Sequence, residues 1–223
     1  MTSAVLFSGG LDSAVLLALE LQRGDGAQPI HVRAGLAWED GEARAIQQLL
    51  AGPPFAGRVA PVATLSVDMR DVYPPTHWAL TGQPPAYDTP DEDVYLEGRN
   101  IVLVSKAAVL CARLKLSRLA LGPLLGNPFP DATPEFFETM ARAMSLGLDR
   151  PFTVATPLAN LHKEDVIALG VELHVPLGLT LSCMNPAGDR HCGVCSKCRE
   201  RRDAFAVAGL PDPTTYAAVS PRD

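Results

Sequence analysis

Short apolar runs along the chain are separated by longer segments in which apolar positions recur with a helical period. The run from Ala4 to Phe7 has the length and bulk of a buried parallel strand, and a Leu-rich helical segment to Leu21 follows after a short turn. Further strands are expected at residues 30–34, 59–67, 118–122 and 152–155. Strands that alternate with helices predict an α/β fold with a parallel sheet, whose ligands lie at the carboxyl ends of the strands.

The same pattern predicts helices at residues 42–50, 99–114, 134–146 and 161–173, the last capped by Asn160. The segment 99–114 is apolar on nearly every side, which predicts a buried helix. Between residues 71 and 98 the prolines exclude a regular helix, and the run Asp91-Glu92-Asp93 is acidic. We interpret this segment as a mobile flap over the predicted ligand site, with a disordered segment as the alternative.

The turn after the first strand reads Ser8-Gly9-Gly10-Leu11-Asp12-Ser13. Its glycines let backbone N–H groups surround an anion, and the following helix directs its free N–H groups at the same point. The lysine of a P-loop is absent. We therefore expect Phe7 and residues 8–13 to bind phosphates. The alternative is a strand–helix turn that Asp12 or Ser13 caps, without a ligand.

Composition excludes several classes of protein. The chain has 223 residues, 47% of them hydrophobic, which suits one domain or one domain with an appendage. A net charge of −6 argues against stable nucleic-acid binding. No apolar run reaches membrane-spanning length, and the N-terminus leads directly into a core strand. We expect no signal peptide, no membrane partner and a cytoplasmic location.

The metal-binding candidates are Cys183, Cys192, Cys195 and Cys198, spaced C-x8-C-x2-C-x2-C. Four thiolates at turn spacings are typical of a closed, structural zinc site, with iron–sulfur ligation as the alternative. The fifth cysteine, Cys111, is expected in the core. Basic residues follow the cluster and either offset the thiolate charge or form a solvated helix face; these are Lys197, Arg199, Arg201 and Arg202.

Several motifs occur in the order of a known family. The loop SGGLDS resembles that of the ATP pyrophosphatase superfamily, and GRN at Gly98–Asn100 and PLANLHKEDVIALG at Pro157–Gly170 follow it. With the cysteine-rich tail, the chain resembles the 7-cyano-7-deazaguanine synthases of the queuosine pathway over nearly its whole length. The resemblance implies a Rossmann-like pyrophosphatase domain, similar to the adenine nucleotide alpha hydrolases, over residues 1–180. It also implies a zinc-binding region over residues 181–223 and a homodimer.

The family converts 7-carboxy-7-deazaguanine and ammonia to the nitrile with ATP and Mg²⁺, through an adenylated carboxylate and an amide. Such transfers need positioning and charge neutralisation. In the first turn of a helix the cation of Lys163 is unfavourable by about 0.3–1 kcal/mol unless a phosphate lies nearby. We therefore expect Lys163 to contact phosphate, with an exposed lysine as the alternative. Arg99 is expected to bind phosphate or carboxylate. Asp12 either holds Mg²⁺ or caps the helix, and we favour the cap.

The substrate segments depart from the family. Its loop D-Y-S-G-Y-P-D-C-R-P-E-F reads GNPFPDATPEF here, so Ala132 and Thr133 replace Cys and Arg. G-Q-R-H after the second strand is also absent. Phe129, Asp131 and Glu135 are expected to form a smaller substrate pocket. We therefore expect the chain to retain the binding and use of ATP. We expect the deazaguanine acid to react slowly, or a related acid to be the substrate in its place.

Four alternatives remain open. One is an amide- or nitrile-forming ligase that acts on another carboxylate. Another is a tRNA-thiolating enzyme, which would need a basic surface and a catalytic cysteine pair. The third is a non-catalytic relative that binds a nucleotide or a protein, and the fourth a zinc-stabilised interaction protein.

Overall fold

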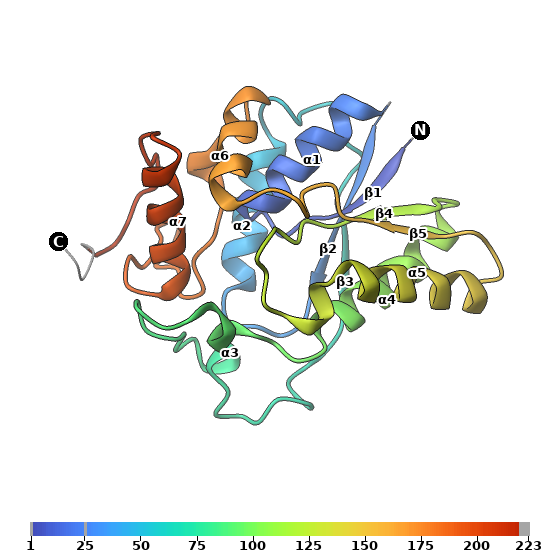
Figure 1. Ribbon diagram of the computed structural model, residues 1–223, viewed down its shortest axis with the longest axis horizontal. Coiled ribbons are helices and arrows are strands. Elements are labelled where there is room, and N and C mark those ends of the chain that lie inside the picture. The colour runs from blue at the N-terminus through green and yellow to red at the C-terminus, as the bar shows by residue number, and fades with distance from the viewer. Residues whose placement is uncertain (1, 25, 219–223) are drawn as a thin grey trace.

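The computed structural model describes residues 2–24 and 26–218. Its centre is a parallel sheet of five strands in the order β3-β2-β1-β4-β5 (Figure 1). The strands are β1 (Ser3–Leu6), β2 (Ala27–Arg33), β3 (Ala63–Ser66), β4 (Arg118–Ala120) and β5 (Thr153–Ala155). Because the chain winds outward from β1 in both directions, a crevice opens at the carboxyl end of β1, which is where such sheets bind ligands.

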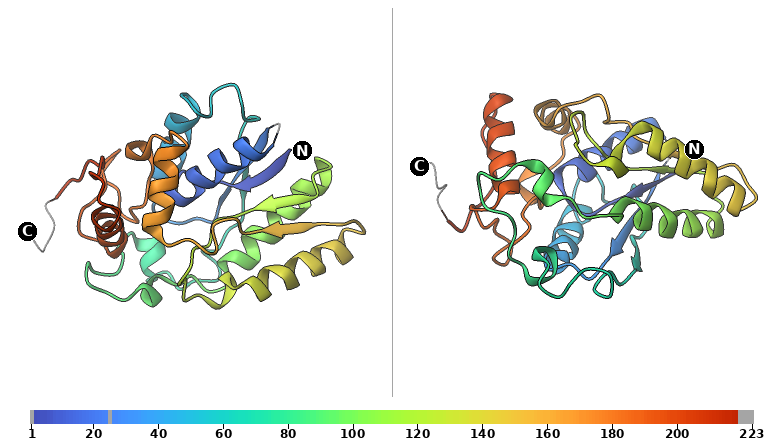
Figure 2. Two further views of the ribbon diagram at one scale, coloured as in Figure 1. Left: turned by 45° about the horizontal axis from the view of Figure 1, so that its top comes forward. Right: turned by 60° about the horizontal axis from the view of Figure 1, so that its bottom comes forward.

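Helices cover both faces of the sheet. They are α1 (Leu11–Arg23), α2 (Glu39–Leu50), α3 (Trp78–Thr81), α4 (Arg99–Arg113), α5 (Pro134–Gly147), α6 (Lys163–Glu172) and α7 (Ser196–Val207). Figure 2 shows α1 and α6 on one side of the sheet and α4 and α5 on the other. Successive side chains of β1 point to opposite faces of the sheet. Val5 packs into the hydrophobic core on the α1 side, and Ala4 packs into the core on the α4 side. The predicted parallel α/β fold is confirmed.

Individual elements differ from the prediction at several points. β2 begins at Ala27, three residues before the predicted strand, and β3 is limited to Ala63–Ser66. Helix α4 is buried on one face only, since Ile101 is 47% and Val109 52% exposed. The predicted burial on all sides was wrong because only the face toward β1, β2 and β4 has the sheet to pack against. Within the described residues, no helix has the length and apolar character that a membrane span needs.

Residues 71–98 form a structured segment beside the C-terminal region. It contains the short helix α3 and a 3-10 turn at Asp91–Val94, so the expectation of no helix was wrong for four residues. Trp78 of this segment stacks on Trp38 with ring centroids 5.7 Å apart. Buried residues of the segment share one hydrophobic cluster with the four clustered cysteines and with residues 34–38. The division of the chain after residue 180 stays a prediction, and so does the mobility of the segment.

Candidate functional site

The loop between β1 and α1 lies at the carboxyl end of the central strand. Gly9 has a φ of 74°, and a Cβ there would approach the backbone nitrogen of Ile46 to 3.1 Å. Glycine therefore fits this position without backbone strain, whereas any other residue would be strained there. On the opposite side, the N–H of Leu181 donates to the carbonyl of Gly9 at 2.9 Å. The loop is thus held in place by α2 and by the C-terminal part of the chain.

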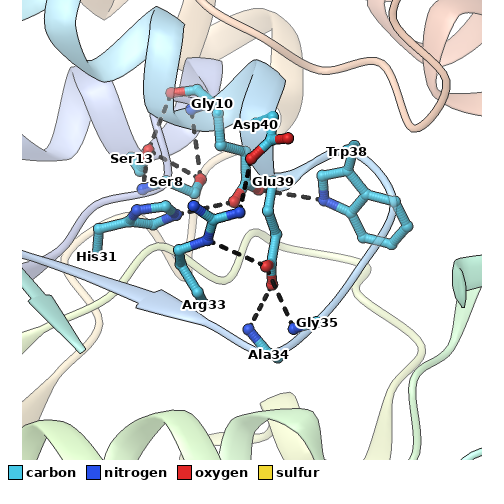
Figure 3. Close-up of polar contacts among 11 residues, drawn as sticks. Ser8, Gly10, Ser13, His31, Arg33, Ala34, Gly35, Trp38, Glu39 and Asp40 are labelled. Carbon is cyan, nitrogen blue, oxygen red and sulfur yellow. Dashed lines mark hydrogen bonds and ion pairs between the residues drawn. The ribbon is translucent and has the colours of Figure 1, made fainter. Parts of the chain in front are cut away.

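The serine hydroxyls shape this loop from within. Ser13 Oγ donates to the carbonyl of Gly10 at 3.0 Å and accepts the N–H of Ser8 at 3.3 Å (Figure 3). The N-cap of α1 is Gly10, and no side chain caps the helix. Our preference for Asp12 as the cap was wrong, because Asp12 lies inside the first turn. The start of α1 keeps free N–H groups, which suit an anion.

Lys163 is the first residue of α6 and faces the loop across a gap between two helices. Its Nζ lies 2.7 Å from Asp12 Oδ2 and 3.4 Å from Glu200 Oε1. The N-cap of α6 is His162 and not Asn160 as predicted, because the chain turns into the helix two residues later. Burial lowers the pKa of Lys163, but the two carboxylates outweigh it and raise this pKa above its usual value. Lys163 is therefore a fixed cation beside the loop.

Arg99 opens α4 on the other side of the loop. Its Nε is buried and has no hydrogen-bond partner in the described part of the chain, and the same holds for Asp12 Oδ1. A buried charged group without a partner is unfavourable, so both atoms are suited to a ligand. Arg99 Nε fits a phosphate or carboxylate oxygen. Asp12 Oδ1 fits a metal ion or an N–H donor.

Two adjoining cavities meet at the loop. The first, of about 290 Å³, lies between the ends of β1 and β2 and helix α4, with apolar walls that include Ile30, Val32 and Leu103. The second, of about 460 Å³, extends to Lys163 and α7. Ser8, Gly10, Asp12 and Arg99 line both cavities, and of residues 7–13 only Gly9 lines neither. The combined space is within the range of small-molecule sites, roughly 300–1,000 Å³.

A buried group of polar side chains lies at the floor of the first cavity and was missed by the sequence analysis. Glu42 Oε2 lies 3.1 Å from His31 Nε2, and Glu42 Oε1 accepts the Trp38 indole N–H at 3.2 Å. Glu39, the first residue of α2, accepts the backbone N–H groups of Ala34 and Gly35. The i, i+4 spacing of Trp38 and Glu42 was the available signal. These contacts hold the turn after β2 against the cavity.

The four cysteines predicted to bind metal come together. Their sulfur atoms all lie within 4.8 Å of one another, and all four residues are buried. Cys192 Sγ is 3.8 Å and Cys195 Sγ 3.5 Å from Cys198 Sγ. Tetrahedral zinc with Zn–S bonds of about 2.3 Å needs sulfur atoms roughly 3.8 Å apart, so the donor set fits one such ion. A cysteine cluster that can hold a metal ion is therefore present.

The basic residues of α7 do not form the solvated face that we considered. Arg201 is fully buried and donates to the carbonyl of Leu177 at 2.7 Å. Lys197 pairs with Glu200 at 2.5 Å, and Arg199 donates to the carbonyl of Thr89 at 2.9 Å. Arg199 and Arg201 thus join the helix to the rest of the protein, and the sequence did not reveal their partners.

Comparison with known proteins identifies the family. Residues 2–209 match the family described as Queuosine biosynthesis protein QueC. The chain belongs to the QueC family. Relatives named 7-cyano-7-deazaguanine synthase support this, one from Magnetococcus marinus with 34% identity over 97% of both chains. Another, from Methanothrix thermoacetophila, is 32% identical over 95% of this chain and 96% of its own length.

A solved structure shares the fold of this QueC chain. It is a 4-thiouridine synthetase in complex with RNA and with bound ATP, aligned over 96% of this chain and 47% of its own, with a TM-score of 0.52. Sequence identity is 17%, so the likeness concerns the fold alone. It agrees with the predicted Rossmann-like pyrophosphatase architecture.

The predicted substrate residues of this QueC chain are only partly together. Phe129 lines both cavities and stacks on Tyr95 with centroids 5.1 Å apart. Asp131 lines the first cavity, but its Oδ2 accepts the N–H of Asn100 at 2.9 Å and so supports the start of α4. Glu135 is exposed and lines neither cavity. Tyr95 was not predicted, because no local pattern marks it.

The two substituted positions of the substrate loop lie away from both cavities. Ala132 is buried under the loop, and Thr133 is the N-cap of α5, where its Oγ1 accepts the N–H of Phe136 at 3.2 Å. The part of the loop that lines the second cavity is Leu124–Phe129. Of the differences between this loop and the family loop, those before Pro130 are therefore the ones that line the second cavity.

Proposed function

We propose that this QueC chain is a 7-cyano-7-deazaguanine synthase, an ATP-dependent ligase that joins nitrogen to the carboxyl carbon of 7-carboxy-7-deazaguanine. The observation that carries the proposal is the loop Ser8–Ser13, shared by two cavities that are each suited to a ring-bearing molecule. The first cavity, which has apolar walls and a polar floor, takes the adenosine of ATP. The second takes the flat acid, with Phe129 as a ring to stack on. The two reacting groups then meet over the loop.

The proposed reaction is the one known for the family. A carboxylate oxygen of the acid attacks the α-phosphorus of ATP, the bond to the β-phosphate breaks, and pyrophosphate leaves with the bonding electrons. Ammonia attacks the acyl carbon, AMP leaves and a proton is lost, which gives the amide. In a second round the amide oxygen attacks another α-phosphorus. Loss of AMP and two protons then leaves the nitrile. The two attacks on phosphorus are in-line displacements, so positioning of the reactants and neutralisation of phosphate charge decide their rates.

Residues of this chain supply that positioning. The N–H groups at the start of α1 and Lys163 bind the phosphates, and Arg99 Nε binds a phosphate or the carboxylate of the acid. Mg²⁺, when bound, neutralises phosphate charge, and Asp12 Oδ1 is the carboxylate oxygen that fits it. Zinc is proposed at the four cysteines as a structural ion with no open position. Sulfur ligands of an iron–sulfur cluster bind separate iron atoms and would lie farther apart.

Other parts of the proposal rest on the sequence. We infer a cytoplasmic homodimer with ammonia as the nitrogen source, and a zinc-binding region that begins near residue 181. The charge of −6 supports the absence of stable nucleic-acid binding.

The test is the conversion of the deazaguanine acid with ATP, Mg²⁺ and ammonia, followed by mass spectrometry and by assay of AMP against ADP. Asp12→Ala and Lys163→Ala are expected to lower the exchange of labelled pyrophosphate into ATP by roughly 10²–10³, as for other transition-state charge contacts. Lys106→Ala, an exposed lysine on α4, is the matched control and should exchange like the parent. Unchanged exchange in both site variants would place the chemistry elsewhere.

A related carboxylate is the second candidate substrate. The segment Leu124–Phe129 lines the second cavity and lacks the Asp, Tyr and Ser of the family loop. Each unmatched polar group of a buried substrate costs about 1–3 kcal/mol, so two such losses amount to a hundredfold or more. We expect slow turnover of the deazaguanine acid, or turnover of a related acid in its place. Rapid formation of the nitrile would contradict the expected slow turnover of the deazaguanine acid. The absence of AMP with every acid tested would favour a non-catalytic relative.

A further inference from the structure

Glu200 connects the metal-binding helix with the phosphate loop. It lies on α7, two residues after Cys198, and its carboxylate lines the second cavity. Glu200 Oε1 is 3.4 Å from Lys163 Nζ, and Glu200 Oε2 is 2.5 Å from Lys197 Nζ. The reaction proposed above does not use this residue.

The contacts of Glu200 form part of a row of alternating charges. Asp12 of α1, Lys163 of α6, and Glu200 and Lys197 of α7 follow one another with ion-pair contacts, and all four line the second cavity. Three helices that are distant in sequence meet in this row. One carboxylate therefore separates two ammonium groups that would otherwise repel each other at the edge of the cavity.

A lysine needs such support because its side chain has four rotatable bonds and a single point of charge. Asp12 is one anchor of Lys163, but Asp12 also has a buried free oxygen that is suited to a ligand. A ligand at Asp12 Oδ1 would share the charge of the carboxylate that holds Lys163, whereas Glu200 is a second anchor on Lys163 that such a ligand leaves unchanged. The side chain of Lys163 is only 15% exposed, so solvent does little to screen the contact.

We propose that Glu200 is a positioning residue that holds Lys163 Nζ beside the phosphate loop. The inference rests on the proposed function, since it concerns the same ATP site. Glu200 does not touch the reacting atoms; it acts through Lys163. It also makes the placement of Lys163 depend on the first turn of α7, which carries two of the four clustered cysteines at or beside its start.

The first experiment compares Glu200→Gln with the parent, both loaded with zinc. We expect the pyrophosphate exchange rate and ATP affinity together to fall roughly 10- to 100-fold, as for loss of a hydrogen bond to a charged group. Thermal stability and zinc content should stay at the parent values. Glu200→Asp keeps the charge but shortens its reach and should give an intermediate loss. Glu138→Gln, an exposed glutamate on α5, is the matched control.

The decisive measurement is a double-mutant cycle on ATP affinity, measured by calorimetry. If Glu200 acts through Lys163, Glu200→Gln should change affinity less than twofold in a Lys163→Ala protein. Equal losses in both backgrounds would overturn the proposal, as would parent-like affinity in both Glu200 variants. Loss of zinc or of fold in both Glu200 variants would show a structural role and also overturn it. A failure of the proposed function can be distinguished from a failure of this inference, because the parent protein itself would then show no pyrophosphate exchange with any acid.

Discussion

Arg201 is the residue whose removal should affect the C-terminal region most. It is fully buried, and its guanidinium lies 5.3 Å from the ring centroid of Phe205. It donates to Leu177 O at 2.7 Å, Thr180 Oγ1 at 2.9 Å, Ser182 Oγ at 3.0 Å and Thr214 Oγ1 at 2.5 Å. One side chain thus joins α7 to residues 177–182 and to the C-terminal tail.

The perturbation is Arg201→Met, which replaces the aliphatic stem and removes the charge. Leu177 O keeps the hydrogen bond from Thr180 Oγ1, so it is not left without a donor. Asp212, 3.8 Å from Arg201, loses a buried counter-charge, and the hydroxyls of Ser182 and Thr214 lose a charged donor. These losses should lower the free energy of unfolding by about 3–5 kcal/mol. Because a buried guanidinium no longer has to be desolvated, about 1–2 kcal/mol of this loss is offset. We expect a net loss of about 3 kcal/mol.

The assay is unfolding of zinc-loaded protein, followed by circular dichroism at fixed zinc concentration. A loss of about 3 kcal/mol corresponds to a Tm lower by roughly 6–12 °C in a protein of this size. The matched control is Arg142→Met, since Arg142 is exposed on α5, and it should change stability by less than about 0.5 kcal/mol. ATP affinity should also fall, because Leu181, within the segment that Arg201 holds, bonds to Gly9. A loss below about 1 kcal/mol would refute the reasoning.

Two further predictions concern the metal site and the packing of α6 on α1. Elemental analysis should find one zinc per chain, and Cys195→Ser should lose it and melt much lower, because structural zinc contributes folding free energy; iron with a coloured spectrum, or a stable protein without metal, would contradict this. In Gly170→Ala the new Cβ would lie 2.8 Å from Val15 Cγ2 and 3.0 Å from Leu177 Cδ2, which should cost about 1–3 kcal/mol in urea unfolding. Gly147→Ala is its control, because a Cβ there meets nothing within 4 Å.

Several site features could be predicted because they are local. A strand, a glycine turn and a helix follow directly in the chain, so residues 3–23 predicted the loop between β1 and α1 and its place at the end of a strand. The cysteines lie within 16 residues, from Cys183 to Cys198, and their spacing alone indicated a cluster. Lys163 in the first turn of a helix was a local anomaly of charge, from which we predicted a phosphate partner; the carboxylates of Asp12 and Glu200 beside it were not predicted.

Other features depended on which elements pack together. Asn160 is not a cap because α6 begins two residues later than predicted, and Asp12, inside the first turn of α1, pairs with Lys163 of another helix. Glu135 was expected in the pocket, but α5 turns it to solvent. Periodicity could not show that α4 keeps one face exposed, since the same apolar residues fit a helix buried on one side or on all sides.

The sequence by itself determined the fold class, the family, the loop and the cysteine cluster, because each depends on residues that are close along the chain or on an ordered set of motifs. Only the tertiary structure decided that Asp12, Lys163 and Glu200 form one row across three helices, and that His31 and Glu42 form a buried pair under a cavity. Charge pairs over such sequence separations form when packing brings their elements together. Hydrophobic pattern specifies which face of an element is buried, and the partners of that face are set by the fold as a whole.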